Sequence, residues 1–130
     1  MLSERNDMKK TFEGPIKAAG APYSPVVERD GLLFISGQVP LDPATKQIVP
    51  GGIEEQTRQL SNLTGALAAA GLTPADVLKT TVFLTDMGHY AAMNAIYAES
   101  FSEAPPARSA VAVAALPFGC LVEIEAVAGR

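Results

Sequence analysis

The sequence predicts an α+β fold, and three observations support this class. Two long stretches carry apolar residues at the three- and four-residue spacings of a helix, whereas several short runs are rich in β-branched and apolar residues, as strands are. The order of these segments, strand, helix, strand, helix and then two strands, is typical of a sheet covered by helices. With 130 residues, of which 48% are apolar, the chain fits one compact domain, which we expect to span residues 1–130.

The first half of the chain contains one strand and one helix with clear signals. Residues 1–13 are expected to be a loosely ordered segment or a first strand, within a hairpin-like N-terminal region. The run LLFISGQ, from Leu32 to Gln38, is short, apolar and bounded by glycine, and it predicts a strand. Between Ile53 and Ala70 apolar residues recur at helical spacing, with glutamates in the first turn and a glycine just past the end, so we expect one helix there.

The second half contains a strand, a helix and two more strands. Val77 to Leu84 is β-branched and apolar enough for a strand. A helix fits residues 89–101, and residues 108–115 and 121–128 are predicted to form the last two strands, joined by the sequence LPFGC. The helix is expected to turn an apolar and aromatic stripe toward the core. This stripe consists of Tyr90, Met93, Tyr97 and Phe101.

The strand that begins at Arg108 is not polar on either face. Alternation of side chains puts Arg108 and three alanines on one face and Ser109 with two valines on the other. Two helices can cover only one face of the sheet, so the other face needs cover, which a second copy of so small a chain can supply. The sequence therefore predicts a homo-oligomer.

Charge and the scarcity of metal-ligating residues exclude several classes of function. The formal net charge is -4, and no cluster of Lys or Arg provides the basic patch of a nucleic-acid or anionic-membrane binder. Cys120 and His89 are the only cysteine and the only histidine, so one chain can assemble neither a disulfide nor a Cys/His zinc site. No segment has the pattern of a signal peptide or a membrane span, and we expect a cytoplasmic protein.

Arg108 is the only charged residue between Glu103 and Glu123, and a guanidinium keeps its charge in proteins. It must therefore stay in water, pair with an acid of its own chain or bind an anion from elsewhere. Glu123 and Glu125 point to one face of the last predicted strand, and two adjacent carboxylates repel each other. One of them is expected to have a raised pKa or a cationic partner. The spacing leaves two roles open, an ion pair with Arg108 or a carboxylate that handles protons.

The other reactive side chains have ordinary interpretations. Cys120 is expected to be a buried thiol, because its only candidate base is His89, which we expect to be exposed at a helix start. Tyr23 stands apart from the other tyrosines in a proline-flanked loop. Ser36 and Gly37 lie at a strand end, where the glycine lets a ligand approach closely, and no GxSxG motif makes Ser36 a nucleophile.

Seven segments, which cover nearly the whole chain from about residue 16 to residue 128, occur in an order shared with a known family. They are APYSPVV, LLFISGQVPLDP, GGIEEQTRQLSNLTGALAAAGL, DVLKTTVFLTDM, YAAMNAIYAESF, PPARSAVAVAALP and VEIEAVA. Through these segments the sequence resembles the RidA (YjgF) family of reactive-intermediate deaminases.

The resemblance implies a fold, an assembly and a reaction. The fold would be the chorismate-mutase-like (YjgF-type) fold, a mixed sheet with two helices on one face. The assembly would be a homotrimer with the sheets packed together inside and three active sites in clefts between subunits. The reaction would be that of a 2-iminobutanoate/2-iminopropanoate deaminase, a hydrolase that turns reactive 2-imino acids or enamines into 2-oxo acids and ammonia without a cofactor or metal. Such an enzyme limits damage by reactive metabolites.

The resemblance also implies site residues. The essential arginine of the family falls on Arg108, which would bind the substrate carboxylate, and the family's acidic residue falls on Glu123, which would activate water. Three positions, Ala21, Pro25 and Ala112, depart from the usual residues and bear on the substrate range. The substrate-binding positions fall on Tyr23, Ser36, Gly37, Asn94, Arg108 and Ala110.

Two alternatives remain open from the sequence. One is a pathway-specific deaminase of the same family that acts on an aminoacrylate or 2-aminomuconate type of substrate. The other is a trimer without catalytic activity that binds small carboxylates and has a regulatory role. An endoribonuclease or translation-inhibitor role, which has been attached to some relatives, is disfavoured by the acidic charge.

Overall fold

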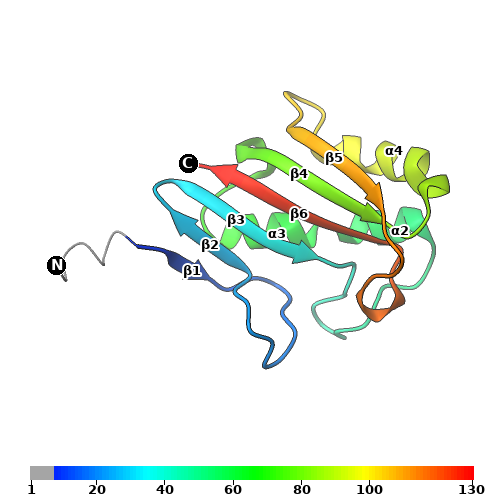
Figure 1. Ribbon diagram of the computed structural model, residues 1–130, viewed down its shortest axis with the longest axis horizontal. Helices are drawn as coiled ribbons and strands as arrows, with labels where there is room; N and C mark the ends of the chain where they lie inside the picture. The colour runs from blue at the N-terminus through cyan, green and yellow to red at the C-terminus, as the bar shows by residue number, and fades with distance from the viewer. Residues whose placement is uncertain (1–7) are drawn as a thin grey trace.

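The computed structural model describes residues 8–130, and in this part of the chain six strands form one mixed sheet with helices on one face (Figure 1). The strands are β1 (Lys10–Phe12), β2 (Val26–Arg29), β3 (Leu32–Gln38), β4 (Val77–Leu84), β5 (Ala107–Ala112) and β6 (Val122–Gly129). The helices are α2 (Ile53–Gln59), α3 (Asn62–Ala69) and α4 (Tyr90–Ser100). The predicted α+β class and the order of elements are confirmed.

The strand order β1-β2-β3-β6-β4-β5 places the last strand of the chain in the middle of the sheet and β5 at one edge. Strands β4 and β5 are parallel, and the other neighbouring pairs are antiparallel. A parallel pair needs a crossover connection, which α4 provides between β4 and β5. Glu123 therefore lies on a central strand, and Arg108 lies on an edge strand.

The core lies between the sheet and the helices. Its side chains come from alternate positions of the strands and from the inner faces of the three helices, as side-chain alternation and helical periodicity require. The most buried large apolar side chains are Leu33, Leu67, Leu84, Met93, Ile124, Val26, Val82 and Val122.

The helix expected over residues 53–70 is in fact two helices. The chain tightens at the junction, where the Leu60 amide bonds to the Thr57 carbonyl at 3.0 Å and the Leu63 amide to the Leu60 carbonyl at 2.9 Å. Directly after the junction, the buried Asn62 donates to the carbonyls of Val39 and Leu41 at 3.1 and 2.7 Å. A continuous apolar stripe could not reveal this break, because the partners of Asn62 lie more than 20 residues earlier.

Smaller differences occur at the ends of the other elements. Residues 87–89 form a separate short 3-10 turn before α4, and β5 ends at Ala112 rather than at residue 115. Of the expected inner stripe, Met93 and Phe101 are buried and Tyr97 is partly buried, but Tyr90 is 38% exposed. Tyr90 is thus not a core residue.

The other face of the sheet is open in a single chain. It carries large apolar side chains that remain well exposed, among them Phe34 at 51% and Val111 at 42%. None of the helices within residues 8–130 is long and apolar enough to cross a membrane.

Candidate active site

Four of the predicted site residues come together at one end of the open face. Tyr23, Ser36, Gly37 and Glu123 line a cavity of about 500 Å³, together with Glu125. The segment before β2, the end of β3, the start of β6 and the loop before β6 all contribute to its walls. A cavity of this size is typical of small-molecule sites.

A break in the β3–β6 ladder shapes the floor of this cavity. The pairing shifts register between Ile35 and Gln38, and the Ser36 hydroxyl donates to the Ser24 carbonyl at 2.6 Å. Gly37 faces the Glu123 side chain so closely that a methyl group there would overlap the carboxylate, with the carboxyl carbon only 3.0 Å away. The glycine thus leaves the space that the Glu123 carboxylate occupies.

The Glu123 carboxyl is half-buried, and burial raises its pKa by disfavouring the charged form. Repulsion from the neighbouring Glu125 carboxylate raises this pKa further. Within residues 8–130, neither glutamate forms an ion pair. Of the two outcomes expected for adjacent carboxylates, the structure therefore has the raised pKa and not the cationic partner.

The Tyr23 loop closes one side of the cavity. The Ala18 amide donates to the Tyr23 hydroxyl at 3.1 Å, and the Lys17 ammonium lies 5.8 Å from the centre of the Tyr23 ring. Tyr23 is 41% exposed and lines the cavity.

Arg108 lies in a different environment, between β5 and α4. Its guanidinium donates to the Tyr90 hydroxyl at 2.9 Å, and its Cζ lies 4.8 Å from the centre of the Tyr97 ring and 5.5 Å from that of Tyr90. The Tyr97 hydroxyl in turn bonds to the buried Thr80 at 2.7 Å. Two aromatic faces therefore hold the guanidinium by cation-π contact, and in the described part of the chain it forms no ion pair.

Asn94 and Ala110 accompany Arg108. The Asn94 side chain, the charge of Arg108 and the hydrogen bond from Arg108 all lower the pKa of the Tyr90 phenol, in that order of importance. The Asn94 Oδ1 is buried and has no hydrogen-bond partner among the described residues. Ala110 is partly buried against the core and leaves the surface beside Arg108 without a bulky side chain.

The two groups of residues lie on opposite faces of the sheet in one chain. Arg108 pairs in register with Thr80, whose side chain is fully buried beneath α4, so Arg108 belongs to the helix-covered face. Glu123 pairs with Phe83 and alternates with buried Val122 and Ile124, so it belongs to the open face. An intrachain ion pair between Arg108 and Glu123, which the sequence left open, is therefore not formed.

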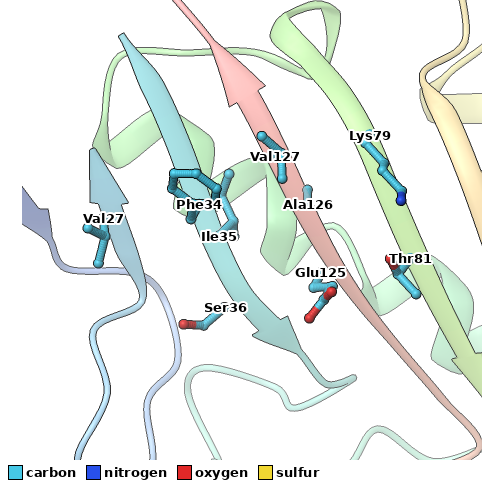
Figure 2. Close-up of a pocket in the computed structure, with 9 residues that line it drawn as sticks. All are labelled: Val27, Phe34, Ile35, Ser36, Lys79, Thr81, Glu125, Ala126 and Val127. Atoms are coloured by element: carbon cyan, nitrogen blue, oxygen red, sulfur yellow. The ribbon is translucent and has the colours of Figure 1, made fainter. Parts of the chain in front are cut away.

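A second hollow, of about 370 Å³, lies on the same open face of the sheet, beside the cavity that contains Glu123. Figure 2 shows Ser36 on β3, Glu125 on β6, and Thr81 and Lys79 on β4 around it. Ser36 and Glu125 line both hollows, so the two lie next to each other on this face.

Cys120 and His89 belong neither to the residues around Arg108 nor to those around Glu123. Cys120 is buried as expected, its thiol donates to the Val122 carbonyl at 3.4 Å, and burial raises its pKa. A thiol with a raised pKa is a poor nucleophile at neutral pH. His89 was expected to be exposed, but it is partly buried at the short turn before α4. Its Nδ1 is buried and has no hydrogen-bond partner among the described residues.

Three residues that the sequence did not indicate also contribute to these surroundings. Tyr90 and Tyr97 were assigned to the core stripe, although both contact the Arg108 guanidinium. Tyr90 and Tyr97 lie three and four residues from Met93 and seven residues from each other. This spacing identified one helix face but not which part of that face contacts Arg108 at the sheet edge. Phe118 in the loop before β6 also lines the cavity, and its position next to Gly119 was the only local sign of an unusual turn.

The chain is thus a small α+β protein with a mixed sheet, helices on one face and an open second face, and the predicted site residues fall into two groups on these two faces. A model of the family described as Endoribonuclease L-PSP matches residues 15–129. The chain belongs to this family, which is also known as the YjgF/RidA family.

Relatives with related names are similar over most of their length. A mouse protein named 2-iminobutanoate/2-iminopropanoate deaminase is 51% identical over 112 residues, which cover 85% of this chain and 83% of the mouse protein. A RutC family protein of Pyrococcus horikoshii is 52% identical over 108 residues, 82% of this chain and 86% of its own. Among solved structures, Escherichia coli TdcF with bound serine superimposes with a TM-score of 0.86 at 38% identity, covering 93% of this chain and 98% of TdcF.

Proposed function

We propose that the protein hydrolyses reactive 2-imino acids, including 2-iminobutanoate and 2-iminopropanoate, to 2-oxo acids and ammonia. The observation that carries this proposal is the pair of half-sites. One holds a cation without an acidic partner in the described chain, and the other holds a carboxyl group with a raised pKa. An anionic substrate with an electrophilic carbon needs both. The names of the mammalian relatives at 46–51% identity support the reaction type.

The half-sites would be joined by assembly into a homotrimer. Since Arg108 and Glu123 lie on opposite faces of one chain, a cleft that contains both would form where the β5 edge of one subunit meets the open face of the next. The exposed apolar side chains of the open face, such as Phe34, would be buried in the same assembly. A cyclic arrangement repeats this contact at each interface.

In such a cleft, Arg108 would bind the substrate carboxylate through two parallel hydrogen bonds. The ring contacts with Tyr90 and Tyr97 hold the guanidinium in place before the substrate arrives, which reduces the entropy lost on binding. The free Asn94 Oδ1 could accept a hydrogen bond from the imine nitrogen. Binding would thereby fix the orientation of the C=N group.

Glu123 would move the protons. With the imine nitrogen protonated, the Glu123 carboxylate accepts a proton from water as the water oxygen bonds to the imine carbon, which gives a carbinolamine. Glu123 then returns this proton to the amino nitrogen, the C–N bond breaks, and the hydroxyl proton passes to the departing ammonia as the carbonyl forms. The products are one 2-oxo acid and one ammonium ion for each protonated imine and water. A carboxyl with a raised pKa is a stronger base than an ordinary glutamate and a usable acid in the return step.

The test is the rate of imine loss when the purified protein is coupled to a threonine dehydratase. We expect wild type to accelerate the loss, Arg108→Ala to reduce kcat/KM by about 100-fold or more, and Arg108→Lys to recover part of the effect because it keeps the charge but not the fork. No acceleration by wild type, or equal acceleration by Arg108→Ala, would contradict the proposal. Binding of 2-oxo acids without turnover would instead favour a carboxylate-binding trimer with a regulatory role.

A further inference from the structure

One wall of the cavity that contains Glu123 is apolar, and Phe118 is its most exposed member. Phe118 lies in a short turn over Pro117–Gly119, immediately before β6. At 64%, its exposure is the largest among the large apolar side chains of residues 8–130. An aromatic ring left this open gains little from the packing of its own chain. The apolar part of the cavity lining also includes Ile16, Val39, Leu41 and Pro117.

The backbone holds Phe118 in an unfavourable conformation. Its φ and ψ are 61° and 17°, in the left-handed region that side chains other than glycine rarely adopt. Residues held in this region are found preferentially at ligand sites, where the surrounding structure maintains them. Asp30, Lys46 and Ala104 also have a positive φ, but of these four residues only Phe118 lines the cavity, which makes it a candidate ligand contact.

Hydrogen bonds within the turn and directly after it hold the turn in place. The Cys120 amide bonds to the Pro117 carbonyl at 3.3 Å, and the Cys120 side chain is buried. The next amide, that of Leu121, donates to the buried Gln56 side chain of α2 at 2.8 Å. Since the turn is held from within the core, the ring of Phe118 is presented at the cavity by the fold itself.

The size of the cavity sets what this wall can contact. In a single chain the cavity has a volume of about 500 Å³, within the range of pockets that hold drug-sized ligands, so it offers more space than a three- or four-carbon acid fills. A substrate whose reacting carbon lies at Glu123 would extend its own side chain into the remaining space, which Phe118 borders. Burying an apolar substrate side chain against such a wall favours binding in proportion to the apolar area removed from water, so a methyl group adds the least binding free energy.

We propose that Phe118 is a specificity-determining residue that favours 2-imino acids with branched, bulky apolar side chains over those with a methyl group. This inference rests on the proposed function, since it assigns the substrate side chain to a cavity that contains Glu123. It concerns selection among substrates, so it predicts a ratio of affinities rather than the presence of activity.

The experiment is calorimetric binding of two reaction products, 4-methyl-2-oxopentanoate and pyruvate, to the assembled protein. We expect wild type to bind the branched acid about tenfold more tightly or better, in line with the discrimination that hydrophobic pockets achieve. Phe118→Asn suits the left-handed backbone and removes the ring, and it should reduce the preference to less than about threefold with little change for pyruvate. Phe118→Tyr keeps the ring and should keep the preference.

Other outcomes overturn the inference. An unchanged preference in Phe118→Asn would show that the ring does not contact the ligand. If Phe118→Asn binds both acids more weakly to the same extent and its assembly dissociates in sedimentation, Phe118 is a subunit contact rather than a ligand contact. If wild type binds the branched acid selectively but does not hydrolyse imines, the proposed reaction fails, and only the selection of bound 2-oxo acids by Phe118 stands. If wild type hydrolyses imines but binds the two acids equally, the inference alone fails.

Discussion

The Arg108 and Glu123 regions differ in how their charged groups are stabilised. The Arg108 guanidinium is on an edge strand, where two tyrosine rings and a phenol hydroxyl hold it and keep its charge. The Glu123 carboxyl is on a central strand, half-buried beside a second carboxylate, where its charge is disfavoured. The first region is suited to static binding of an anion. The second is suited to proton transfer, because a group that is easily protonated can both accept and return a proton.

The largest effect is expected from removing the carboxylate of the Glu123 region. Glu123→Gln should lower kcat by roughly 10²- to 10⁴-fold, the usual contribution of a general acid–base group. The affinity for 2-oxo acids, which Arg108 would bind, should change far less than kcat. Steady-state kinetics and calorimetry on the same preparation measure both. A variant that loses both properties equally would remove the distinction between the two regions.

The same variant should be more stable than wild type at neutral pH. Because the pKa of Glu123 is raised in the folded state, its ionisation costs folding free energy. The cost is absent below the unfolded pKa of about 4.3, grows as pH rises toward the folded pKa, and is constant above it. Thermal unfolding should therefore give a higher Tm for Glu123→Gln at pH 7, and the difference should shrink as the pH falls through this window. A lower Tm at pH 7 would show that the ionised carboxylate has a stabilising partner.

An intermediate effect is expected from Gly37→Ala. The added methyl group overlaps the Glu123 carboxylate and must displace it, and misplacement of a reacting group by about 1 Å can cost 100-fold in rate. The loss should fall on kcat. The clash involves only the open face, so Arg108 should still bind carboxylates. In a Glu123→Gln background the added methyl group should lower kcat much less, because the side chain that it displaces no longer transfers protons. Equal losses in both backgrounds would mean that Gly37 acts through something other than Glu123.

The smallest effect is a shift in the pH profile of kcat. Glu125 raises the pKa of Glu123 by repulsion, so Glu125→Gln should move the acid limb of the profile to lower pH. Activity should rise with pH along this limb, since Glu123 must be ionised to accept a proton from water. If the acid limb does not move in Glu125→Gln, the limb reports the ionisation of a group other than Glu123.

The elements of the fold could be predicted because each depends on local pattern. The bounds of β3 and β4 match the expected strands, since both are short apolar runs that turn signals enclose. The break between α2 and α3 could not be predicted, because it accompanies contacts of Asn62 with a loop far away in the sequence. The site residues came from resemblance, and alternation correctly put Glu123 and Glu125 on one face. Neither source indicated that Arg108 and Glu123 lie on opposite faces, because strand order and helix placement decide this.

The most direct measurement of the central claim is activity in mixed assemblies of two inactive variants. Arg108→Ala and Glu123→Gln chains are coexpressed, and the mixed species are isolated through two different affinity tags. If each site takes Arg108 from one subunit and Glu123 from its neighbour, one of the three sites in every mixed trimer is intact, so the isolated mixed trimers should recover about a third of wild-type activity. If each site belonged to one chain, every site would lack one of the two groups. No recovery in correctly assembled mixed trimers would then contradict the account.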